Sequence, residues 1–347
     1  MINLQDGTMH LSLDPEVGNI PLWKVGGRTP LHTAPWRDDI AVQADLNLPA
    51  VNKRLAGDFL CAPFGHDDVT HGPPHGPPAN SPWDVVAQTT TSAELQLSVP
   101  LRGAHVRKLV QINAAHSALY QTHTVTGGQG QMTLAHHPMT HLGGKGRLSF
   151  SPKQAILTDV IAQYPGHALW SSGQMRQDMH LTCVDGQLWD CRDYPTDHKV
   201  EDFAILVEAP DRKIGWTCVM RDDEDDMLII LKDAAVLPLT MLWISNGGRD
   251  FAPWNGRHTG VLGIEDGIAG GANGFAMALS DNRLTDLGVP TYFELGATHR
   301  FRHAMISLPR PKGWQDLAAL DLAPGHLLLY ASNGEIFKHP FVSEFFE

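Results

Sequence analysis

The chain has 347 residues, of which 42% are hydrophobic, so it contains enough apolar sequence for a sizeable buried core. Its formal net charge of −12 argues against nucleic acid as a partner, because phosphate contacts require clustered Lys and Arg side chains. The same charge disfavours an anionic membrane surface, and no apolar run approaches the ~18 residues that a membrane helix needs. We therefore expect neither a nucleic acid nor a membrane as a partner.

The N-terminal segment "MINLQDGTMHLSLDPEVG" lacks the basic stretch followed by an apolar core that marks a secretory signal. The four cysteines, Cys61, Cys183, Cys191 and Cys218, show no CxxC spacing. In a chain without an export signal such cysteines are most simply reduced thiols. These features predict a cytoplasmic protein.

Alternation of apolar and polar residues, typical of strands, dominates the sequence. In "SAELQLSV" (92–99) it is typical of a strand with one buried face. The same alternation in "IGWTCVM" (214–220) predicts another strand with one buried face, and similar or continuous apolar runs predict strands over 106–112, 118–125, 203–208, 227–231, 241–245 and 300–307. The segment "TGGQGQ" (126–131) is typical of the turn of a hairpin, and "GWQDLAALDLA" (313–323) is the one modest helix candidate.

Turn-forming residues are spread along the whole chain, with 33 glycines and 24 prolines and no single linker that collects them. Many short strands separated by such turns are typical of a sandwich or a barrel. We therefore predict an all-β fold, a large antiparallel β-sandwich formed by residues 1–347 as a single domain. Two β-domains are the alternative, because the chain exceeds the usual length of one domain.

The segment "HGPPHGPPANSPW" (71–83) combines histidine, proline and tryptophan in a way that fits three interpretations. His66, Asp67, His71 and His75 are suitable metal ligands, but they lack the HExxH spacing that places two imidazoles on one helical face. A polyproline ligand for another protein is disfavoured because His and Gly interrupt the prolines. One wall of a substrate pocket is the interpretation we favour.

The acidic run "RDDEDD" (221–226) lies between two predicted strands. It lacks the spacing and the glycine of an EF-hand calcium loop, so we expect a solvated turn.

Four short motifs occur in a fixed order between residues 54 and 306. Pro63-Phe64-Gly65 is followed by His75-Gly76 and Trp83, "LAHHPMTHL" (134–142) contains His137-Pro138, "GVLGIEDG" (260–267) contains Glu265, and "YFELGATHRFRHAMI" covers 292–306. Each motif is weak alone, but the four in this order resemble the aldose 1-epimerase (galactose mutarotase-like) superfamily. The resemblance is nearest to its hexose-6-phosphate mutarotase-like branch.

The resemblance implies the galactose mutarotase-like supersandwich and the interconversion of the α and β anomers of an aldose. That reaction moves one proton from the C1 hydroxyl to a base and another from an acid to the ring oxygen, and it needs neither a metal nor a nucleotide cofactor. A carboxylate and an imidazole suit the two roles, since the first is ionised at pH 7 and the second titrates near 6.5. The expected partner is a small sugar, an aldose or a sugar phosphate.

By the resemblance, Glu265 is the general base and His137 the general acid. His136 and His141 are alternative candidates for the general acid. Of these two, only His141 would lie on the same strand face as His137. His75 would bind the substrate near its ring oxygen.

The resemblance also implies an aspartate that contacts sugar hydroxyls. Asp202 in "VEDFAILV" (200–207) is the best match, with Asp193 and Asp197 as alternatives. Trp254 in "APWNGRHTG" could stack on a sugar ring or serve in packing, which the sequence leaves open.

The chain departs from the related branch at residues 77–79, where Pro-Pro-Ala replaces the Phe-Ala-Arg that follows "HG". The missing arginine puts phosphorylated hexoses in doubt. Arg54, which we take as a substrate-binding candidate, or Arg249 and Arg257 could replace it.

Other function classes remain open at this point. The main alternative is a carbohydrate-binding or regulatory protein that keeps the fold without turnover, because fold does not guarantee chemistry. A glycoside hydrolase would need two carboxylates flanking a bond, and only one strong candidate is present. A metal-dependent sugar isomerase is disfavoured by the absence of metal-ligand spacing, and the sequence leaves a homodimer open.

Overall fold

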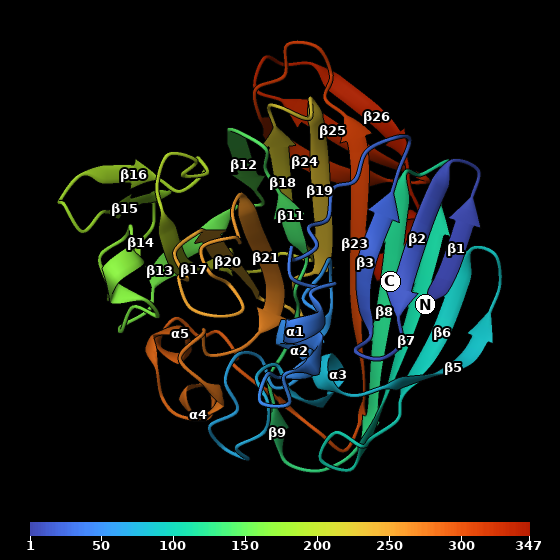
Figure 1. The fold of residues 1–347 in the computed structure, drawn as a ribbon. Coiled ribbons are helices and arrows are strands. Elements are labelled where there is room, and N and C mark those ends of the chain that lie inside the picture. Colours follow the sequence, from blue (N-terminus) through green and yellow to red (C-terminus); the bar gives the residue numbers. More distant parts are fainter.

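The computed structural model describes residues 1–347, and it consists mainly of two eight-stranded antiparallel sheets that face each other (Figure 1). The strands of sheet 1 are, in spatial order, β14 (Met175–Arg176), β13 (Lys153–Thr158), β17 (Val200–Glu208), β20 (Leu239–Asn246), β21 (Val261–Ile268), β10 (Leu134–His136) and β4 (Leu60–Cys61), with β11 (Met139–His141) also paired to β21. The strands of sheet 2 are β12 (Gly146–Phe150), β18 (Ile214–Arg221), β19 (Asp226–Asp233), β23 (Thr298–Pro309), β8 (Ala118–Gly127), β7 (Ala104–Asn113), β6 (Ser92–Leu97) and β5 (Trp83–Gln88). The predicted antiparallel β-sandwich is confirmed.

Smaller elements surround the two sheets. Two three-stranded sheets comprise β1 (Ile2–Asp6), β2 (Met9–Asp14) and β3 (Asn19–Lys24), and β24 (Leu317–Ala323), β25 (His326–Ala331) and β26 (Ile336–Pro340). Two-stranded sheets pair β15 (His180–Thr182) with β16 (Leu188–Asp190), and β9 (Gln131–Met132) with β22 (Phe293–Glu294). The helices are α1 (Ile40–Ala44), α2 (Ala50–Lys53), α3 (Gly76–Asn80), α4 (Phe275–Ala278) and α5 (Arg283–Asp286), and single 3₁₀ turns cover Pro165–His167 and Ser343–Phe346.

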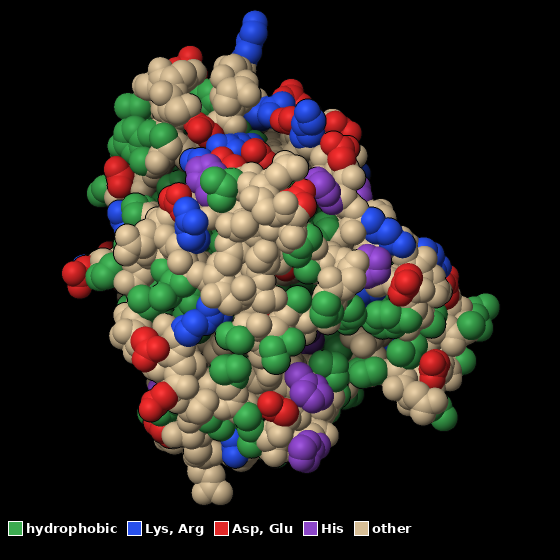
Figure 2. All heavy atoms as spheres, turned by 90° about the vertical axis from the view of Figure 1, so that its left-hand side faces the viewer, with side chains coloured by type: hydrophobic (Ala, Val, Ile, Leu, Met, Phe, Trp, Pro, Cys, Tyr) green, Lys and Arg blue, Asp and Glu red, His purple; other side chains and the backbone are tan.

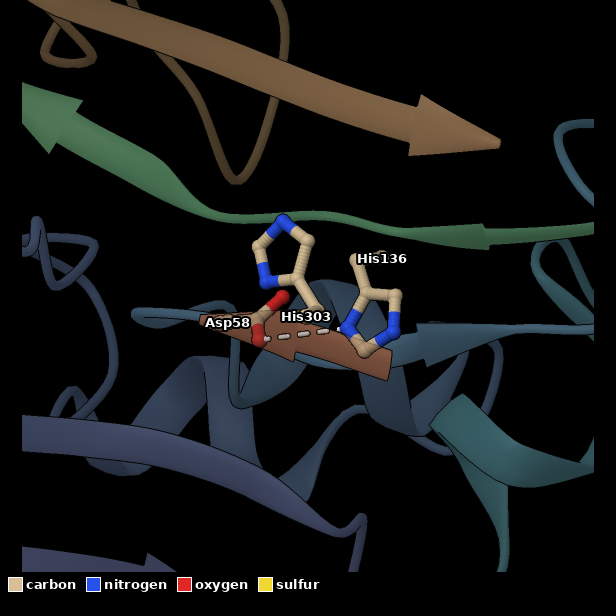
Figure 3. A group of neighbouring side chains, drawn as sticks. All are labelled: Asp58, His136 and His303. Carbon is tan, nitrogen blue, oxygen red and sulfur yellow. Dashed lines mark ion pairs between the residues drawn. The ribbon is translucent and has the colours of Figure 1, made fainter. Parts of the chain in front are cut away.

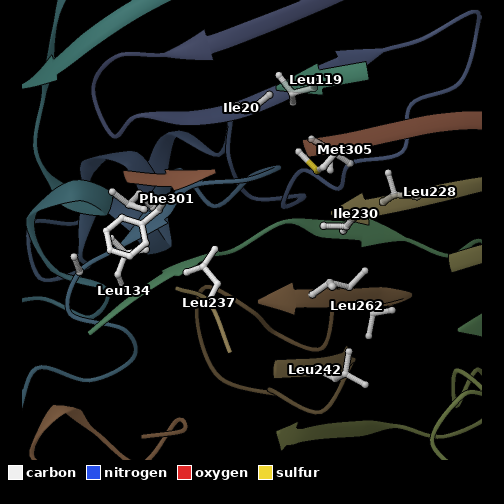
Figure 4. Packing of buried hydrophobic residues seen from close by; sticks show 14 of the residues in the cluster. Ile20, Leu119, Leu134, Leu228, Ile230, Leu237, Leu242, Leu262, Phe301 and Met305 are labelled. Carbon is white, nitrogen blue, oxygen red and sulfur yellow. The ribbon is translucent and has the colours of Figure 1, made fainter. Parts of the chain in front are cut away.

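The main core fills the space between the two sheets (Figure 4). Leu134, Leu242 and Leu262 of sheet 1 belong to the same buried cluster as Ile230 and Met305 of sheet 2. Burying a leucine or isoleucine side chain contributes about 1.5–3 kcal/mol, so this layer supplies much of the force that joins the sheets.

A second cluster covers the outer face of sheet 1. It joins Phe203 and Trp243 on that face to Trp36, Phe59 and Phe64, which lie in the segment that carries α1 to α3. The segment therefore forms a wall above sheet 1, and polar groups on this face of the sheet lie beneath it.

The sheet β24–β26 covers the outer face of sheet 2. Leu327 and Leu329 of β25 share a cluster with Trp216 and Cys218 of β18, while Val219, which points the other way, joins the main core. The predicted strand at 214–220 is therefore present but buried on both faces.

The predicted helix at 313–323 is wrong, because Leu317–Ala323 forms strand β24. A β-bulge shifts the register between Leu317 and Ala319, so that the buried residues Leu317 and Leu320 are three positions apart. That spacing is the one expected of a helix, and the local bulge imitates it.

The glycine-rich segment 126–131 is a turn, but it does not close a hairpin. Strand β8, which ends at Gly127, pairs with β7 and β23, whereas the strand after the turn, β9, pairs with β22. Gly127, Gly128 and Gly130 adopt positive φ angles there, which glycine tolerates best. The chain thus leaves sheet 2 at this turn.

None of the helices has both the length and the apolar composition that crossing a membrane requires. On the face drawn in Figure 2, Lys and Arg side chains are interspersed with Asp and Glu. Several exposed apolar side chains belong to the region of β14–β16 at the left of Figure 1: Val160, Ile161, Met175, Val184 and Leu188.

Candidate functional site

A cavity of about 280 Å³ opens on the outer face of sheet 1, beneath the wall formed by the segment that carries α1 to α3. Side chains of β17, β20 and β21 form its floor, and loops around residues 63–75 and 247–254 form its sides. Small-molecule sites typically begin near 300 Å³, so the cavity has room for one small ring rather than for a chain of them.

His137 and Glu265 meet on the floor of this cavity. Glu265 lies in the middle of β21, and His137 follows the last residue of β10, which pairs with β21 on one side. His137 Nε2 lies 2.9 Å from Glu265 Oε1, and the two side chains are 5% and 2% exposed. The structure thus brings the predicted acid and the predicted base into direct contact.

The ring of His137 is held from several sides. Phe59 stacks on it with centroids 4.4 Å apart, and Trp243 approaches it edge-on at 5.6 Å. Its backbone N–H donates to Asp58 Oδ1 at 2.9 Å, while its Nδ1 has no hydrogen-bond partner within the protein. Because Nδ1 is buried, an imidazole fixed in this way can transfer a proton only through Nε2, at the ring edge that faces the cavity.

His75 lies beside His137, in the histidine- and proline-rich segment. Its backbone has φ of 63°, and Gly76 follows with φ of 67°, where a Cβ atom would lie 1.9 Å from the carbonyl oxygen of Ala62. Only glycine fits that position, so the local backbone fixes where His75 projects. The rings of His75 and His137 are 5.2 Å apart, and His75 lines the cavity together with Pro74.

Burial, with smaller contributions from His137 and Arg249, lowers the pKa of His75 well below 6.5. The imidazole of His75 is therefore neutral at pH 7. Its Nδ1 accepts a long hydrogen bond of 3.4 Å from the backbone N–H of Gly65, which leaves the proton on Nε2.

Two charged residues of the cavity, Glu201 and Arg249, form an ion pair. Arg249 Nε donates to Glu201 Oε1 at 2.7 Å, and the carboxylate also accepts from Ser245 Oγ at 2.8 Å and from Trp243 Nε1. The guanidinium lies over the ring of Trp254 at 4.3 Å from its centroid. Burial raises the pKa of Glu201, and Arg249 is the main opposing influence.

Asp202, the predicted substrate-binding aspartate, lines the cavity, and so does its neighbour Glu201, which sequence reasoning missed. The Asp202 carboxylate accepts backbone hydrogen bonds of 2.8 Å from Leu169 and from Trp170, so it holds that segment at the edge of the cavity. Burial raises the pKa of Asp202 to about 6, against these backbone hydrogen bonds. Strand alternation was the signal that could have found Glu201, because Glu201 shares the outer face of sheet 1 with Phe203.

Trp254 and Arg54, the other two predicted substrate contacts, lie in different places. Trp254 lines the cavity, is 3% exposed, and contacts the edge of Trp36 at 4.6 Å. Arg54 lies outside the lining, because its guanidinium pairs with Asp14 at 2.9 Å. Arg54 therefore does not compensate for the arginine missing at residues 77–79, whereas Arg249 lies in the cavity.

The alternative candidates for the acid and for the aspartate lie elsewhere. His136 points into the space between the two sheets. His141 and Asp197 line a separate, more open and mostly polar hollow of about 600 Å³, and Asp193 pairs with Arg147. That hollow holds no contacting acid–base pair like His137 and Glu265.

The acidic run 221–226 forms the predicted turn, between β18 and β19. Its ends are buried, however, because Arg221 pairs with Asp226 at 2.6 Å. Within the turn, Asp222 and Asp225 contact Arg310. The run therefore serves to close a hairpin.

A group of histidine rings supports the Glu201 side of the cavity and makes stability depend on pH. His258 Nδ1 lies 2.8 Å from Ser245 Oγ, and the ring of His32 contacts that of His258 at 4.7 Å. Burial, assisted by His141, lowers the pKa of His32 to about 4. Between pH 6.5 and 4 the unfolded chain binds a proton at His32 that the folded chain does not, so stability falls as the pH falls.

We therefore expect replacement of His32 by phenylalanine to reduce the acid sensitivity of the protein. The free energy of unfolding of the wild type should lose about 2–3 kcal/mol more than that of the variant between pH 6.5 and 4. Urea unfolding at several pH values measures both curves. Parallel curves would show that His32 is not a source of the acid sensitivity.

No family model matches the sequence, and no curated protein matches it at a significant level. Solved structures do match. A galactose mutarotase-like protein from Lactobacillus casei ATCC 334 is 10% identical with a TM-score of 0.59, and the match covers 89% of this chain and all of that one (100%). A galactose mutarotase related enzyme from Lactobacillus acidophilus is 12% identical, with a TM-score of 0.58 and coverage of 90% and 98%.

Galactose 1-epimerase from Lactobacillus acidophilus NCFM is 9% identical with a TM-score of 0.56, and the match covers 88% of this chain and 93% of that one. Identities this low establish the fold alone. The predicted galactose mutarotase-like β-sandwich is confirmed by them.

Proposed function

We propose that the protein is a cofactor-independent aldose 1-epimerase, which interconverts the α and β anomers of a sugar. One observation carries the proposal: a histidine and a glutamate, both almost fully buried, lie 2.9 Å apart on the floor of a cavity of about 280 Å³. The two oxygens that exchange protons in mutarotation are bonded to the same carbon, so the reaction requires an acid and a base that are close neighbours.

In the proposed reaction, Glu265 removes the proton of the C1 hydroxyl while His137 gives its Nε2 proton to the ring oxygen. The C1–ring oxygen bond breaks and the free aldehyde forms. After rotation about the C1–C2 bond, His137 takes the proton back from the hydroxyl as this attacks C1, and Glu265 protonates the aldehyde oxygen.

Other cavity residues would position the sugar. Neutral His75 has its proton on Nε2, so it can donate a hydrogen bond to a sugar oxygen next to His137. Arg249 covers one face of the Trp254 indole. The indole narrows the cavity around a single sugar ring.

The charge of the lining supports a neutral sugar as the substrate. Arg249 is the only Lys or Arg in the lining, and Glu201 already neutralises it at 2.7 Å. Glu265 and Asp202 add negative charge. A phosphate group would therefore meet net negative potential with no unpaired cation to receive it.

We accordingly expect hexose 6-phosphates to be poorer substrates than the matching free hexoses. The kcat/KM for the phosphate should be at least about tenfold lower, equivalent to ~1.4 kcal/mol. Polarimetry of freshly dissolved single anomers, with and without protein, measures the rates for each pair of sugars.

Replacement of Glu201 by glutamine provides a matched test, because it leaves Arg249 without its carboxylate partner. The preference for the neutral sugar should then become smaller. Equal or faster exchange of the 6-phosphate by the wild type would contradict the proposed substrate class, and no acceleration with any sugar would contradict the proposed reaction.

A further inference from the structure

A second polar cluster lies between the two sheets, on the opposite face of sheet 1 from the cavity. Asp58, His136 and His303 each offer a ligand-type atom there, and these atoms all lie within 4.8 Å of one another (Figure 3). The three side chains are fully buried, and the ring of His123 contacts that of His136 at 4.7 Å. The residues come from segments that are far apart in the sequence and from both sheets.

Asp58 is a buried carboxylate that no Lys or Arg side chain neutralises, and its one ion-pair neighbour is His136, whose Nδ1 lies 3.8 Å from Asp58 Oδ2 (Figure 3). Its Oδ1 accepts the backbone N–H of His137 and its Oδ2 accepts Gln121 Nε2, but no Lys or Arg nitrogen lies within 4.0 Å of it. Lys108 instead donates to the carbonyl oxygen of Gly18 at 2.7 Å. Buried charges in proteins are normally either paired or bound to a metal ion.

The histidines of the cluster have unused nitrogens. Both ring nitrogens of His136 and of His123, and Nδ1 of His303, are buried and have no hydrogen-bond partner within the protein. Each such group destabilises the fold by about 1–3 kcal/mol unless something satisfies it. The unsatisfied nitrogens of His136 and His303 beside one carboxylate therefore point to a ligand.

His303 shows the arrangement typical of a metal-binding histidine. Its Nε2 lies 3.1 Å from Asp266 Oδ2, which holds the proton on Nε2 and leaves Nδ1 as a lone-pair donor. Asp266 itself is paired with Lys232 at 2.9 Å, so it acts on the ring of His303 rather than as a ligand.

We propose that Asp58, His136 and His303, with a water molecule in the fourth position, bind one divalent transition-metal ion of the zinc class. Imidazole nitrogens together with one carboxylate suit Zn²⁺, whereas Mg²⁺ and Ca²⁺ prefer oxygen ligands. The rings of His136 and His303 lie nearly parallel with centroids 4.2 Å apart, so ligation requires them to rotate and the donor atoms to close by about 1 Å. The ion would join sheet 1 to sheet 2 and would stand apart from the proton transfers of the proposed reaction.

The test is refolding in the presence of metal, because ligands this deeply buried would be reached during folding. Protein unfolded in guanidinium chloride is refolded with Zn²⁺, with Co²⁺, with Mg²⁺, or with a chelator, and is then freed of loose metal by gel filtration. We expect one equivalent of zinc or cobalt per chain and a visible Co²⁺ absorption band of tetrahedral intensity. The Tm should rise by ~5 °C or more over the chelator sample, with no rise for Mg²⁺.

A variant pair separates this site from adventitious binding at the surface. Replacement of His303 by glutamine should remove the bound equivalent, whereas replacement of the exposed His105 by glutamine should not. If the His303 variant does not fold, the stoichiometry and cobalt spectrum of the wild type decide the matter. Wild-type protein that retains less than about a fifth of an equivalent of zinc and of cobalt, or a folded His303 variant that retains the full equivalent, would overturn the proposal.

Discussion

Replacement of Glu265 by glutamine is expected to lower the rate of anomer exchange about 10³-fold and to leave sugar affinity almost unchanged. Glutamine has nearly the same shape and would remain in the middle of β21, next to His137. Its amide, however, cannot accept the proton of the C1 hydroxyl. Polarimetry gives the rate, and the sugar-induced changes in NMR chemical shift give the affinity.

The exposed Glu16, changed to glutamine, is the matched control and should retain the wild-type rate. A Glu265 variant that keeps more than about a tenth of the wild-type rate would show that another group is the base. A variant that loses sugar binding together with turnover would assign Glu265 to binding rather than to proton transfer.

Replacement of Lys232 by methionine is expected to lower the free energy of unfolding by about 3–5 kcal/mol, the largest loss among the substitutions proposed. The buried ammonium lies 3.1 Å from Glu208 Oε1 and 2.9 Å from Asp266 Oδ1, and it donates to Thr240 Oγ1 at 2.7 Å. Methionine matches its length but leaves Asp266 without its cation between the two sheets. Lys153 still pairs with Glu208, so the unpaired charge is that of Asp266.

Urea unfolding monitored by tryptophan fluorescence measures this effect. The same change at the exposed Lys24 should alter the free energy of unfolding by less than about 0.5 kcal/mol. A loss below about 1 kcal/mol in the Lys232 variant would mean that the interior tolerates an unpaired Asp266, and that the ion pair is not a main source of stability.

The strands of both sheets could be predicted from the sequence because alternation and apolar runs are local properties. Of the three local predictions that failed, one was misled by a local bulge and two depended on partners far away in the chain. The helix predicted at 313–323 failed because a bulge in β24 imitates helical spacing, and the hairpin at 126–131 failed because β9 pairs with β22. The one-sided burial expected of 214–220 failed because a distant sheet, β24–β26, covers the other face.

The residues of the candidate site likewise divide into those that local sequence predicts and those that depend on tertiary contacts. Glu265 and His137 could be named because short motifs surround them, and the structure brings them to 2.9 Å. Asp202 was named and lines the cavity, whereas Glu201 was missed although strand parity places it on the same face as Phe203. The pairing of Glu201 with Arg249 gave no sequence signal, because Arg249 belongs to a loop whose path depends on tertiary contacts.

The central claim is turnover at the His137–Glu265 pair, and exchange NMR at anomeric equilibrium tests it most directly. The protein is added to a neutral aldose, and the exchange rate between the α and β anomeric protons is compared with that in buffer alone. Proton transfer by this pair predicts faster exchange for at least one neutral aldose at catalytic amounts of protein. Binding of sugars, seen as shifted resonances, without any faster exchange would contradict the claim and would identify a sugar-binding protein.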